Sequence, residues 1–407
     1  MHIAMDALCM LFSKAFDMIE AEQIGTSERH SMRVATLCAR MGNGHGFTSD
    51  AIAALTTCAL FHDNALTEYL FYSKKDARHT RDLRLHCTYG QRNLAWLPFT
   101  KNIDGFVLYH HECETGKGPF GKKAGEFPLE AALIAAADYA DAKHHLQRVP
   151  PNGLGALRDS IAADIGTIST RAAMEALLDV LDTDTLESLR CENIYRTLEK
   201  LLPPWKVLAE DVSVIRLAAF IAHIIDCKSY FTRKHTEQIA NRTWLASGHY
   251  GYANMERGPL FLAAALHDIG KIATPLGVLE KPGRLTKEEL AVIQEHVRLS
   301  YDWLGEVAGL GKIRLWASQH HEKLDGSGYS FGLGAEDLDF NSRLIACIDI
   351  YQAVCEERPY HPARNHQDTM PILYGMADNG KLDGQIVKDM DEMMADYSLR
   401  DIPPPSL

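Results

Sequence analysis

The stretch Phe261-Leu262-Ala263-Ala264-Ala265-Leu266-His267-Asp268-Ile269-Gly270-Lys271 contains the pattern that decides the fold. Six apolar residues in a row predict the end of a buried helix, and a His-Asp pair follows them directly. One helix end can therefore present an imidazole and a carboxylate side by side. The first half of the chain has a similar stretch, Leu60-Phe61-His62-Asp63.

Histidines and aspartates around these two pairs form the same ordered series twice. The first His precedes the His-Asp pair by 32 residues in both halves, and the third His precedes a His-His pair by 24 residues in both. The distance from the His-Asp pair to the third His differs: it is 24 residues in the first half and 29 in the second. A longer loop in the second half explains this, because insertions accumulate in loops. We infer an internal duplication, with copies near residues 20–150 and 215–400. The series are His30, His62, Asp63, His86, His110, His111 and Asp138 in the first copy and His235, His267, Asp268, His296, His320, His321 and Asp349 in the second.

The remaining pattern of the chain predicts helices. Apolar residues recur mostly at three- and four-residue intervals, with few alternating runs. Residues 286–289 form a capping-box pattern that opens a helix running to about Leu304, and residues 313–321 and 342–356 also have helical periodicity. The predicted fold is all-α, with helical bundles at residues 1–150 and 213–407 joined by a helical connecting region at 151–212.

The composition favours a cytoplasmic globular protein of two domains. A chain of 407 residues exceeds a single ordinary core, and 46% hydrophobic with 24% charged residues is typical of globular proteins. The net charge of −12 argues against non-specific binding to DNA, RNA or anionic membranes. The N-terminus has no leader pattern, and the strongest apolar stretch, 214–225, is too short to span a bilayer. None of the nine cysteines lies in a C-x-x-C pair, so we expect reduced, buried thiols.

Five histidines and two aspartates in each series are a plausible metal-ligand set. Imidazole and carboxylate are ligands that first-row metals prefer, and the set suffices for two ions when one carboxylate bridges them. Asp268 is the natural bridge because it lies beside His267. Two ions can lower the pKa of a shared water and hold phosphate oxygens, which is the chemistry of a metal-dependent phosphohydrolase. A lone histidine such as His223 is more often a packed or surface residue, whereas an ordered set repeated within one chain indicates a site.

Two segments of the second copy resemble a known family. His267-Asp268-Ile269-Gly270-Lys271 and His320-His321-Glu322-Lys323-Leu324-Asp325-Gly326-Ser327-Gly328-Tyr329 are similar to the signature of the HD-GYP subgroup of the HD metal-dependent phosphohydrolases. The resemblance spans residues 215–400, and the first copy resembles the wider superfamily more weakly. It implies two HD-type helical bundles. For the second copy it implies hydrolysis of a cyclic dinucleotide, cyclic di-GMP or 3′,3′-cGAMP, to a linear product.

The resemblance also implies roles for residues of the second copy. Its seven-residue series would bind two divalent ions, iron or manganese ahead of zinc, nickel or cobalt. Asp268 and Lys271 would be catalytic, with Lys271 stabilising phosphate charge. Arg358 would grip substrate phosphate with its planar fork, and Gly328 and Tyr329 would line the substrate.

Three departures from the family pattern bear on these roles. Phe231 stands where some members have a glutamate for a third metal ion, so we expect two ions rather than three. Ser330 replaces the proline of the signature, which changes the stiffness of the loop more than its chemistry. His361 stands where a basic residue often contacts substrate in the family, so we expect this replacement to bear on both substrate affinity and substrate choice.

The first copy keeps every predicted ligand and loses other parts of the signature. We therefore expect a domain that binds metal but turns over little substrate. A regulatory or packing role against the second copy, a vestigial fold and a second active phosphodiesterase all stay open. The replaced positions are Leu66 for Lys271, Thr115 for Asp325, Pro119 for Tyr329 and Gln147 for Arg358.

Two other functions compete with this interpretation. One is an HD phosphohydrolase that acts on other nucleotides. The signature segment from His320 to Tyr329 argues against it. The other is a non-catalytic sensor of a cyclic dinucleotide, against which Lys271 and the full ligand set argue. The residues leave the base identity, the metal, the oligomeric state and the pathway open.

Overall fold

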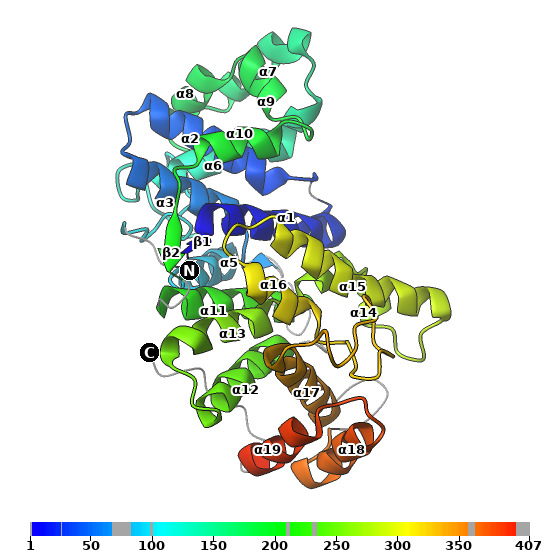
Figure 1. Ribbon diagram of the computed structural model, residues 1–407. Coiled ribbons are helices and arrows are strands. Elements are labelled where there is room, and N and C mark those ends of the chain that lie inside the picture. The colour runs from blue at the N-terminus through cyan, green and yellow to red at the C-terminus, as the bar shows by residue number, and fades with distance from the viewer. Residues whose placement is uncertain are drawn as a thin grey trace. The chain divides into compact units, whose positions relative to one another are not determined.

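The computed structural model describes residues 2–25, 27–66, 83–97, 101–208, 212–229, 234–356 and 363–395. Regular structure in these ranges is almost entirely helical, which confirms the predicted all-α class (Figure 1). Two short strands, β1 (His2–Ala4) and β2 (Lys206–Leu208), pair with each other. The chain divides into two compact units, Ala4–Lys206 and Val207–Leu407, and the second also includes Met1–Ile3.

The first unit is a bundle built on helix α2, which packs against α3 and α6. Residues 131–137 of α6 are all apolar and all buried, so this helix runs through the core. The Thr48 hydroxyl accepts a hydrogen bond from the Ala51 amide and fixes the start of α3. The core helices are α1 (Met5–Ile24), α2 (His30–Gly44), α3 (Ser49–Leu60), α5 (Leu83–Leu94) and α6 (Leu129–His144).

The predicted connecting region is helical and packs on this first bundle. Helices α8 and α10 contact α2, and α8 also contacts α6, as Figure 1 shows. The segment therefore belongs to the first compact unit. After the short η1 (Leu146–Arg148), its elements are η2 (Pro151–Gly153), α7 (Leu154–Ala163), α8 (Arg171–Val180), α9 (Thr183–Ser188) and α10 (Ile194–Leu201).

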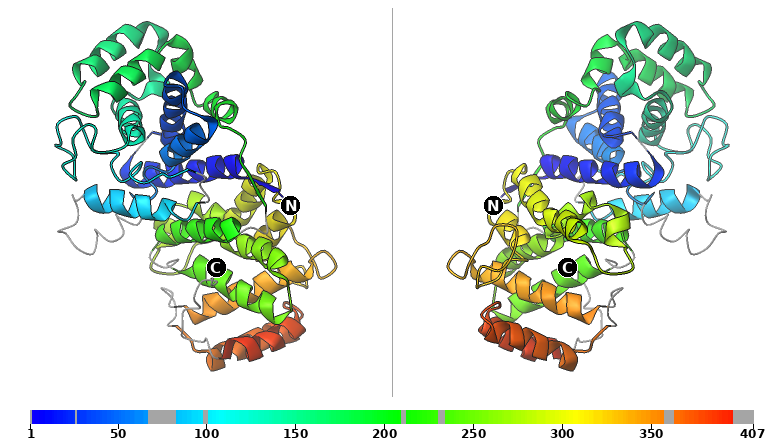
Figure 2. Two further views of the ribbon diagram at one scale, coloured as in Figure 1. Left: turned by 90° about the vertical axis from the view of Figure 1, so that its left-hand side faces the viewer. Right: turned by 90° about the vertical axis from the view of Figure 1, so that its right-hand side faces the viewer.

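The second unit has its core around helix α13, which contacts α11, α12 and α16. Residues 260–266 of α13 are all buried, as expected for a helix surrounded by others. In Figure 2 the orange and red helices α17 to α19 lie side by side at one edge of this unit. The elements are α11 (Val212–Cys227), α12 (His235–His249), α13 (Asn254–Leu266), η4 (Ile269–Ala273), α14 (Leu276–Leu279), α15 (Lys287–Gly305), α16 (Gly311–Ser318), α17 (Phe340–Cys355), α18 (His366–Asp378) and α19 (Gly384–Met394).

Local sequence signals account for several helix boundaries. The predicted capping box is present: Thr286 and Glu289 exchange side-chain to backbone hydrogen bonds at the start of α15, which ends at Gly305 as predicted. The predicted helix over 313–321 is too long, because α16 ends at Ser318. There the Ser318 hydroxyl bonds back to the Arg314 carbonyl, and His320 and His321 lie in a turn.

Two further expectations concern the whole chain. All nine cysteines are free thiols, seven of them buried, as the sequence predicts. Among the described residues, no helix combines the length and the apolar character that crossing a bilayer requires.

Two candidate metal centres

Equivalent elements carry the seven predicted ligands in each copy. The first His opens a helix, α2 or α12, and the His-Asp pair directly follows or nearly follows the end of the next helix, α3 or α13. The third His lies in α5 or α15, and the last Asp lies in α6 or α17. The His-His pairs lie in turns, where their ring centroids are 4.0 Å apart in the first copy and 4.1 Å in the second. Consecutive helical residues would point about 100° apart, so the turn brings both rings to one site.

The second copy gathers its ligands into two groups. Asp268 lies between them: its Oδ2 is 3.2 Å from His267 Nε2 and its Oδ1 is 3.3 Å from His296 Nε2. Asp349 also faces both groups, with Oδ1 3.4 Å from His235 Nε2 and Oδ2 3.5 Å from His321 Nδ1. Asp268 and Asp349 thus each present one oxygen to the first group and the other oxygen to the second, as a bridging ligand must. The groups are His235, His267 and Asp268, and His296, His320 and His321, with ligand atoms of each group within 4.8 Å of one another.

The first copy also gathers its ligands into two groups, with the carboxylates divided differently between them. Asp63 Oδ1 is 2.9 Å from His86 Nε2, and its Oδ2 is 3.5 Å from His62 Nε2. His30 Nε2 is 3.1 Å from Asp138 Oδ1. In each copy the carboxylate of the His-Asp pair therefore presents different oxygens to the second and third histidines. The groups are His30, His62 and Asp138, and Asp63, His86, His110 and His111.

Backbone carbonyls orient the imidazole rings. The Nδ1 atoms of His267, His296 and His320 lie 2.6–2.7 Å from the carbonyl three residues earlier, and His62 and His110 of the first copy make the same contact. A proton on Nδ1 leaves the Nε2 lone pair facing the group. Within the described residues, Nε2 of His267 and Oδ1 of Asp268 are buried and make no hydrogen bond. Buried polar atoms left in this way fit a bound cation.

The charge states of the second copy suit metal binding. Burial lowers the pKa of His321 to about 3, and burial together with the neighbouring His321 lowers the pKa of His320 well below its usual range. Burial would raise the pKa of Asp268, but His267 and Lys271 hold it well below its usual range. At neutral pH these residues are therefore neutral imidazoles and an ionised carboxylate, the forms that bind metal ions.

Protonation is more favourable in one group of the first copy. Burial would lower the pKa of His62, but Asp63 and Asp138 raise it to about 9. His111 resembles its counterpart, because burial lowers its pKa to about 3. Metal binding at the His62 group would therefore release a proton.

The predicted substrate-side residues of the second copy lie beside its ligands. The Lys271 ammonium donates a hydrogen bond to Asp268 Oδ2, and its side chain is 15% exposed. The ring of Tyr329 packs on His321, with centroids 4.8 Å apart. Arg358, Phe231 and His361 lie outside the described residues.

A glutamate that the sequence analysis did not assign holds the glycine loop in each copy. Glu322 accepts hydrogen bonds from the amides of Phe331 and Leu333, and Glu112 accepts them from the amides of Phe120 and Lys122. The loop of the second copy is one residue longer than that of the first, yet each glutamate accepts hydrogen bonds from two backbone amides of its loop. Both glutamates directly follow a His-His pair, and this repeated His-His-Glu pattern is the sequence signal that could have identified them.

Glycine is required where the loop passes this glutamate. A Cβ atom on Gly328 would lie 2.4 Å from Glu322 Cα, and one on Gly118 would lie 2.7 Å from Glu112 Cα. Neither backbone atom can move away without opening the loop. The predicted glycine at 328 therefore has a packing role close to the ligands.

An aspartate from the preceding helix caps each helix that begins with the first His. Asp226 accepts hydrogen bonds from the Thr236 and Glu237 amides, and Asp17 accepts one from the Ser31 amide. The residues just before the two histidines have left-handed backbone conformations and make no side-chain cap. A buried carboxylate thus supplies the cap that places His30 and His235.

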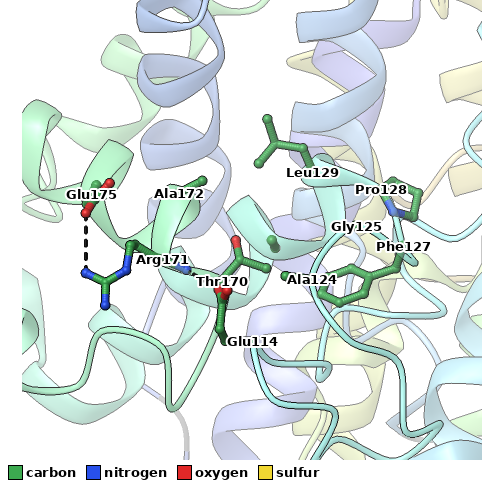
Figure 3. A pocket seen from close by; sticks show the side chains of 11 residues that line it. Glu114, Ala124, Gly125, Phe127, Pro128, Leu129, Thr170, Arg171, Ala172 and Glu175 are labelled. Atoms are coloured by element: carbon green, nitrogen blue, oxygen red, sulfur yellow. Dashed lines mark hydrogen bonds and ion pairs between the residues drawn. The ribbon is translucent and has the colours of Figure 1, made fainter.

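A hollow in the first unit lies between the loop before α6 and the start of α8 (Figure 3). Its charged groups are already paired: Glu114 accepts a hydrogen bond from the Arg171 amide, and the Arg171 guanidinium is 3.6 Å from Glu175. None of the predicted site residues lines it.

Comparison with known protein families agrees with the duplicated geometry. Two family profiles described as HD domain match the chain, one at residues 28–143 and the other at residues 221–386. The chain therefore carries two HD domains in tandem, as the repeated series predicts. HD domains are metal-dependent, which fits the two clusters in each copy.

Curated relatives match most or part of the chain. It is 26% identical to 3'3'-cGAMP-specific phosphodiesterase 1 of Vibrio cholerae serotype O1, over 92% of this chain and 88% of the relative. It is 32% identical to 3'3'-cGAMP-specific phosphodiesterase 3 of the same organism, over 72% of this chain and 63% of the relative. It is 35% identical to the cyclic di-GMP phosphodiesterase response regulator RpfG of Xanthomonas campestris pv. campestris, over 40% of this chain and 43% of the relative.

A solved structure shares the fold of the whole chain. It is described as a cyclic GMP-AMP specific phosphodiesterase of V. cholerae, and the superposition has a TM-score of 0.65. The match covers 97% of this chain and 98% of that one at 18% identity. The tandem arrangement of helical bundles is therefore a known architecture.

Proposed function

We propose that the protein is a metal-dependent phosphodiesterase that opens a cyclic dinucleotide to a linear product, with 3′,3′-cGAMP ahead of cyclic di-GMP as substrate. The observation that carries the proposal is Asp268, whose two oxygens face two separate histidine groups. The order of substrates rests on the relatives. The two that match more than half of this chain are both named for 3'3'-cGAMP.

The second copy would hold two divalent ions. His235 and His267 would bind one, and His296, His320 and His321 would bind the other. Asp268 and Asp349 face both groups and would bridge them. The mixed nitrogen and oxygen ligands suit iron or manganese and also admit zinc, nickel or cobalt. When bound, such ions lower the pKa of a water molecule and neutralise phosphate charge.

Residues beside the ligands would orient and stabilise the substrate. The Lys271 ammonium lies at the bridging carboxylate and is partly exposed, so it can meet a phosphate oxygen. Burial raises the pKa of Tyr329 above its usual range, so its phenol stays protonated and can donate a hydrogen bond. Gly328 keeps the loop close to the ligands, and we keep Arg358 as the proposed phosphate contact.

We also propose that the first copy binds metal and turns over little substrate. Its seven candidate ligands have the residue types of the second copy, and Asp63 faces histidines of both of its groups as Asp268 does. Leu66 stands where Lys271 supplies a charge, and an apolar side chain cannot stabilise a phosphate. This combination supports a metal-loaded domain with a structural or regulatory role.

The test follows hydrolysis of 3′,3′-cGAMP, cyclic di-GMP and cyclic di-AMP by the full-length protein with Mn²⁺ or Fe²⁺. We expect a linear product from 3′,3′-cGAMP, loss of activity in Asp268→Asn and retention in the matched variant Asp63→Asn. Binding of a cyclic dinucleotide with no cleavage of any would instead indicate a sensor. Equal losses in the two variants would contradict the division of roles between the copies.

A further inference from the structure

The first histidine of each copy differs from five other candidate ligands in what holds its Nδ1 atom. His62, His110, His267, His296 and His320 use the carbonyl three residues earlier. His30 and His235 open their helices, so no preceding helical turn offers them such a carbonyl. Another group must hold these two rings.

In the first copy that group is a carboxylate held by a buried arginine. His30 Nδ1 is 2.7 Å from Asp141 Oδ2. The Arg33 guanidinium donates to both oxygens of Asp141, at 2.7 Å and 2.9 Å. Arg33 and Asp141 are both fully buried, so the pair forms a rigid support behind the His30 ring.

In the second copy the support has one more member. His235 Nδ1 is 2.8 Å from Glu356 Oε2, and Gln352 Nε2 donates to Glu356 Oε1 at 2.7 Å. The Arg242 guanidinium, 3% exposed, donates to Gln352 Oε1 at 2.6 Å. A carboxylate again holds the ring, and a buried arginine again anchors it, here through an amide.

The two supports differ by one helical turn on both helices. The arginine lies three residues after the first His in the first copy and seven after it in the second. The acid lies three residues after the last Asp in the first copy and seven after it in the second. Four residues are close to one turn, so Arg242 stays on the same face of α12, and Glu356, the residue directly after α17, lies about one turn beyond Gln352. The positions equivalent to Arg33 and Asp141 hold Gln238 and Gln352, both buried and uncharged.

We propose that Glu356 is the positioning residue of His235, and that Arg242, Gln352 and Glu356 form a one-turn-shifted equivalent of the Arg33–Asp141 support. The carboxylate keeps the proton on Nδ1 and the lone pair on Nε2, and its charge makes the imidazole a stronger ligand. This inference rests on the proposed metal centre of the second copy. The residues that support a metal-binding histidine in this way affect metal affinity by about 10–100-fold.

The test measures Mn²⁺ binding to metal-stripped full-length protein by calorimetry. Every protein carries Asp63→Asn, so that the titration reports the second copy. We expect Glu356→Ala to weaken Mn²⁺ binding by about 10–100-fold. We expect the double variant Glu356→Ala/Gln352→Asp to recover most of that affinity, because it places an acid where the first copy has Asp141 and within reach of Arg242.

The rescue separates positioning from a general structural defect. A loss caused by poor folding would lower the melting temperature of the metal-free protein and would not be repaired by an acid four residues earlier. Unchanged Mn²⁺ affinity in Glu356→Ala, or a double variant no better than the single one, would overturn the inference while the metal centre stands. A parent protein that binds no Mn²⁺ would overturn the metal centre and the support together.

Discussion

At the residue scale, one charge distinguishes two otherwise equivalent ligand sets. Lys271 lies at the bridging carboxylate of the second copy, and Leu66 occupies its place in the first. All seven candidate ligand types are retained on both sides, so the proposed metal binding and turnover would depend on different residues. Substitutions at position 271 can therefore separate them.

We expect Lys271→Met to lower kcat by about 10²–10³-fold, the usual effect of removing one donor that stabilises developing charge. Met keeps much of the length of the side chain and removes only the ammonium. Bound metal, measured by elemental analysis, should not change. A parallel loss of metal would show that Lys271 supports the ligands rather than the substrate.

Glu322 and Glu112 hold equivalent glycine loops, so the same substitution can be compared in the two copies. In Glu322→Gln the new amide group would face a backbone amide, so one of the two hydrogen bonds is lost. We expect a loss of about 1–3 kcal/mol in unfolding free energy, measured by urea denaturation, and a raised KM. Glu112→Gln should cost a similar unfolding free energy and leave KM unchanged. An equal change of KM in both variants would contradict a local effect on the substrate loop.

At the element scale, helices α2 and α12 begin with a ligand and take their caps from a neighbouring helix. Asp226 bonds two amides of α12, although burial raises its pKa to about 7. Asp17 has the same place in the first copy, and burial raises its pKa to about 6. The start of each helix is therefore tied to the titration of a buried carboxyl group.

The sign of the pH effect follows from these pKa values. A carboxyl group whose pKa is higher in the folded state favours folding while it is protonated, and that contribution disappears as the pH rises through the folded value. Asn does not titrate. The melting temperature of Asp226→Asn relative to wild type should therefore rise between about pH 4 and pH 7. Asp17→Asn should behave alike over a slightly lower range. A difference independent of pH would contradict the raised pKa.

Much of this element-level structure was predictable from the sequence. The ligand series repeats at fixed spacing, and the capping box of α15 is a local signal that its residues carry by themselves. The turn at His320 was missed because the helical periodicity continues past Ser318, the residue at which α16 ends. Glu356 was missed for a different reason. A charged residue at a helix end normally faces water, and its contact with His235 joins residues 121 positions apart.

At the scale of the whole molecule, each compact unit contains its own pair of ligand groups. Metal bound only by the folded state adds to the stability of each unit, by about 4 kcal/mol when free metal exceeds its Kd a thousandfold. We expect a chelator to lower the melting temperature of the wild-type protein. The shift should shrink in Asp63→Asn or Asp268→Asn and vanish when both are combined, as measured by calorimetry. A full shift in the double variant would place the metal elsewhere.

The one-turn shift between the two histidine supports limits how the copies can be recombined. Transplanting α2 in place of α12 would bring Arg33 without Asp141, and the incoming guanidinium would be buried opposite the amide of Gln352. Transplanting α6 alone in place of α17 would put Asp141 where Gln352 stands, so that Arg242 would face a second buried carboxylate beside Glu356. The helix that carries the first His and the helix that carries the last Asp must therefore be kept together in each copy, although about a hundred residues of chain separate them. Any chimera of the two halves has to exchange α2 together with α6, or α12 together with α17.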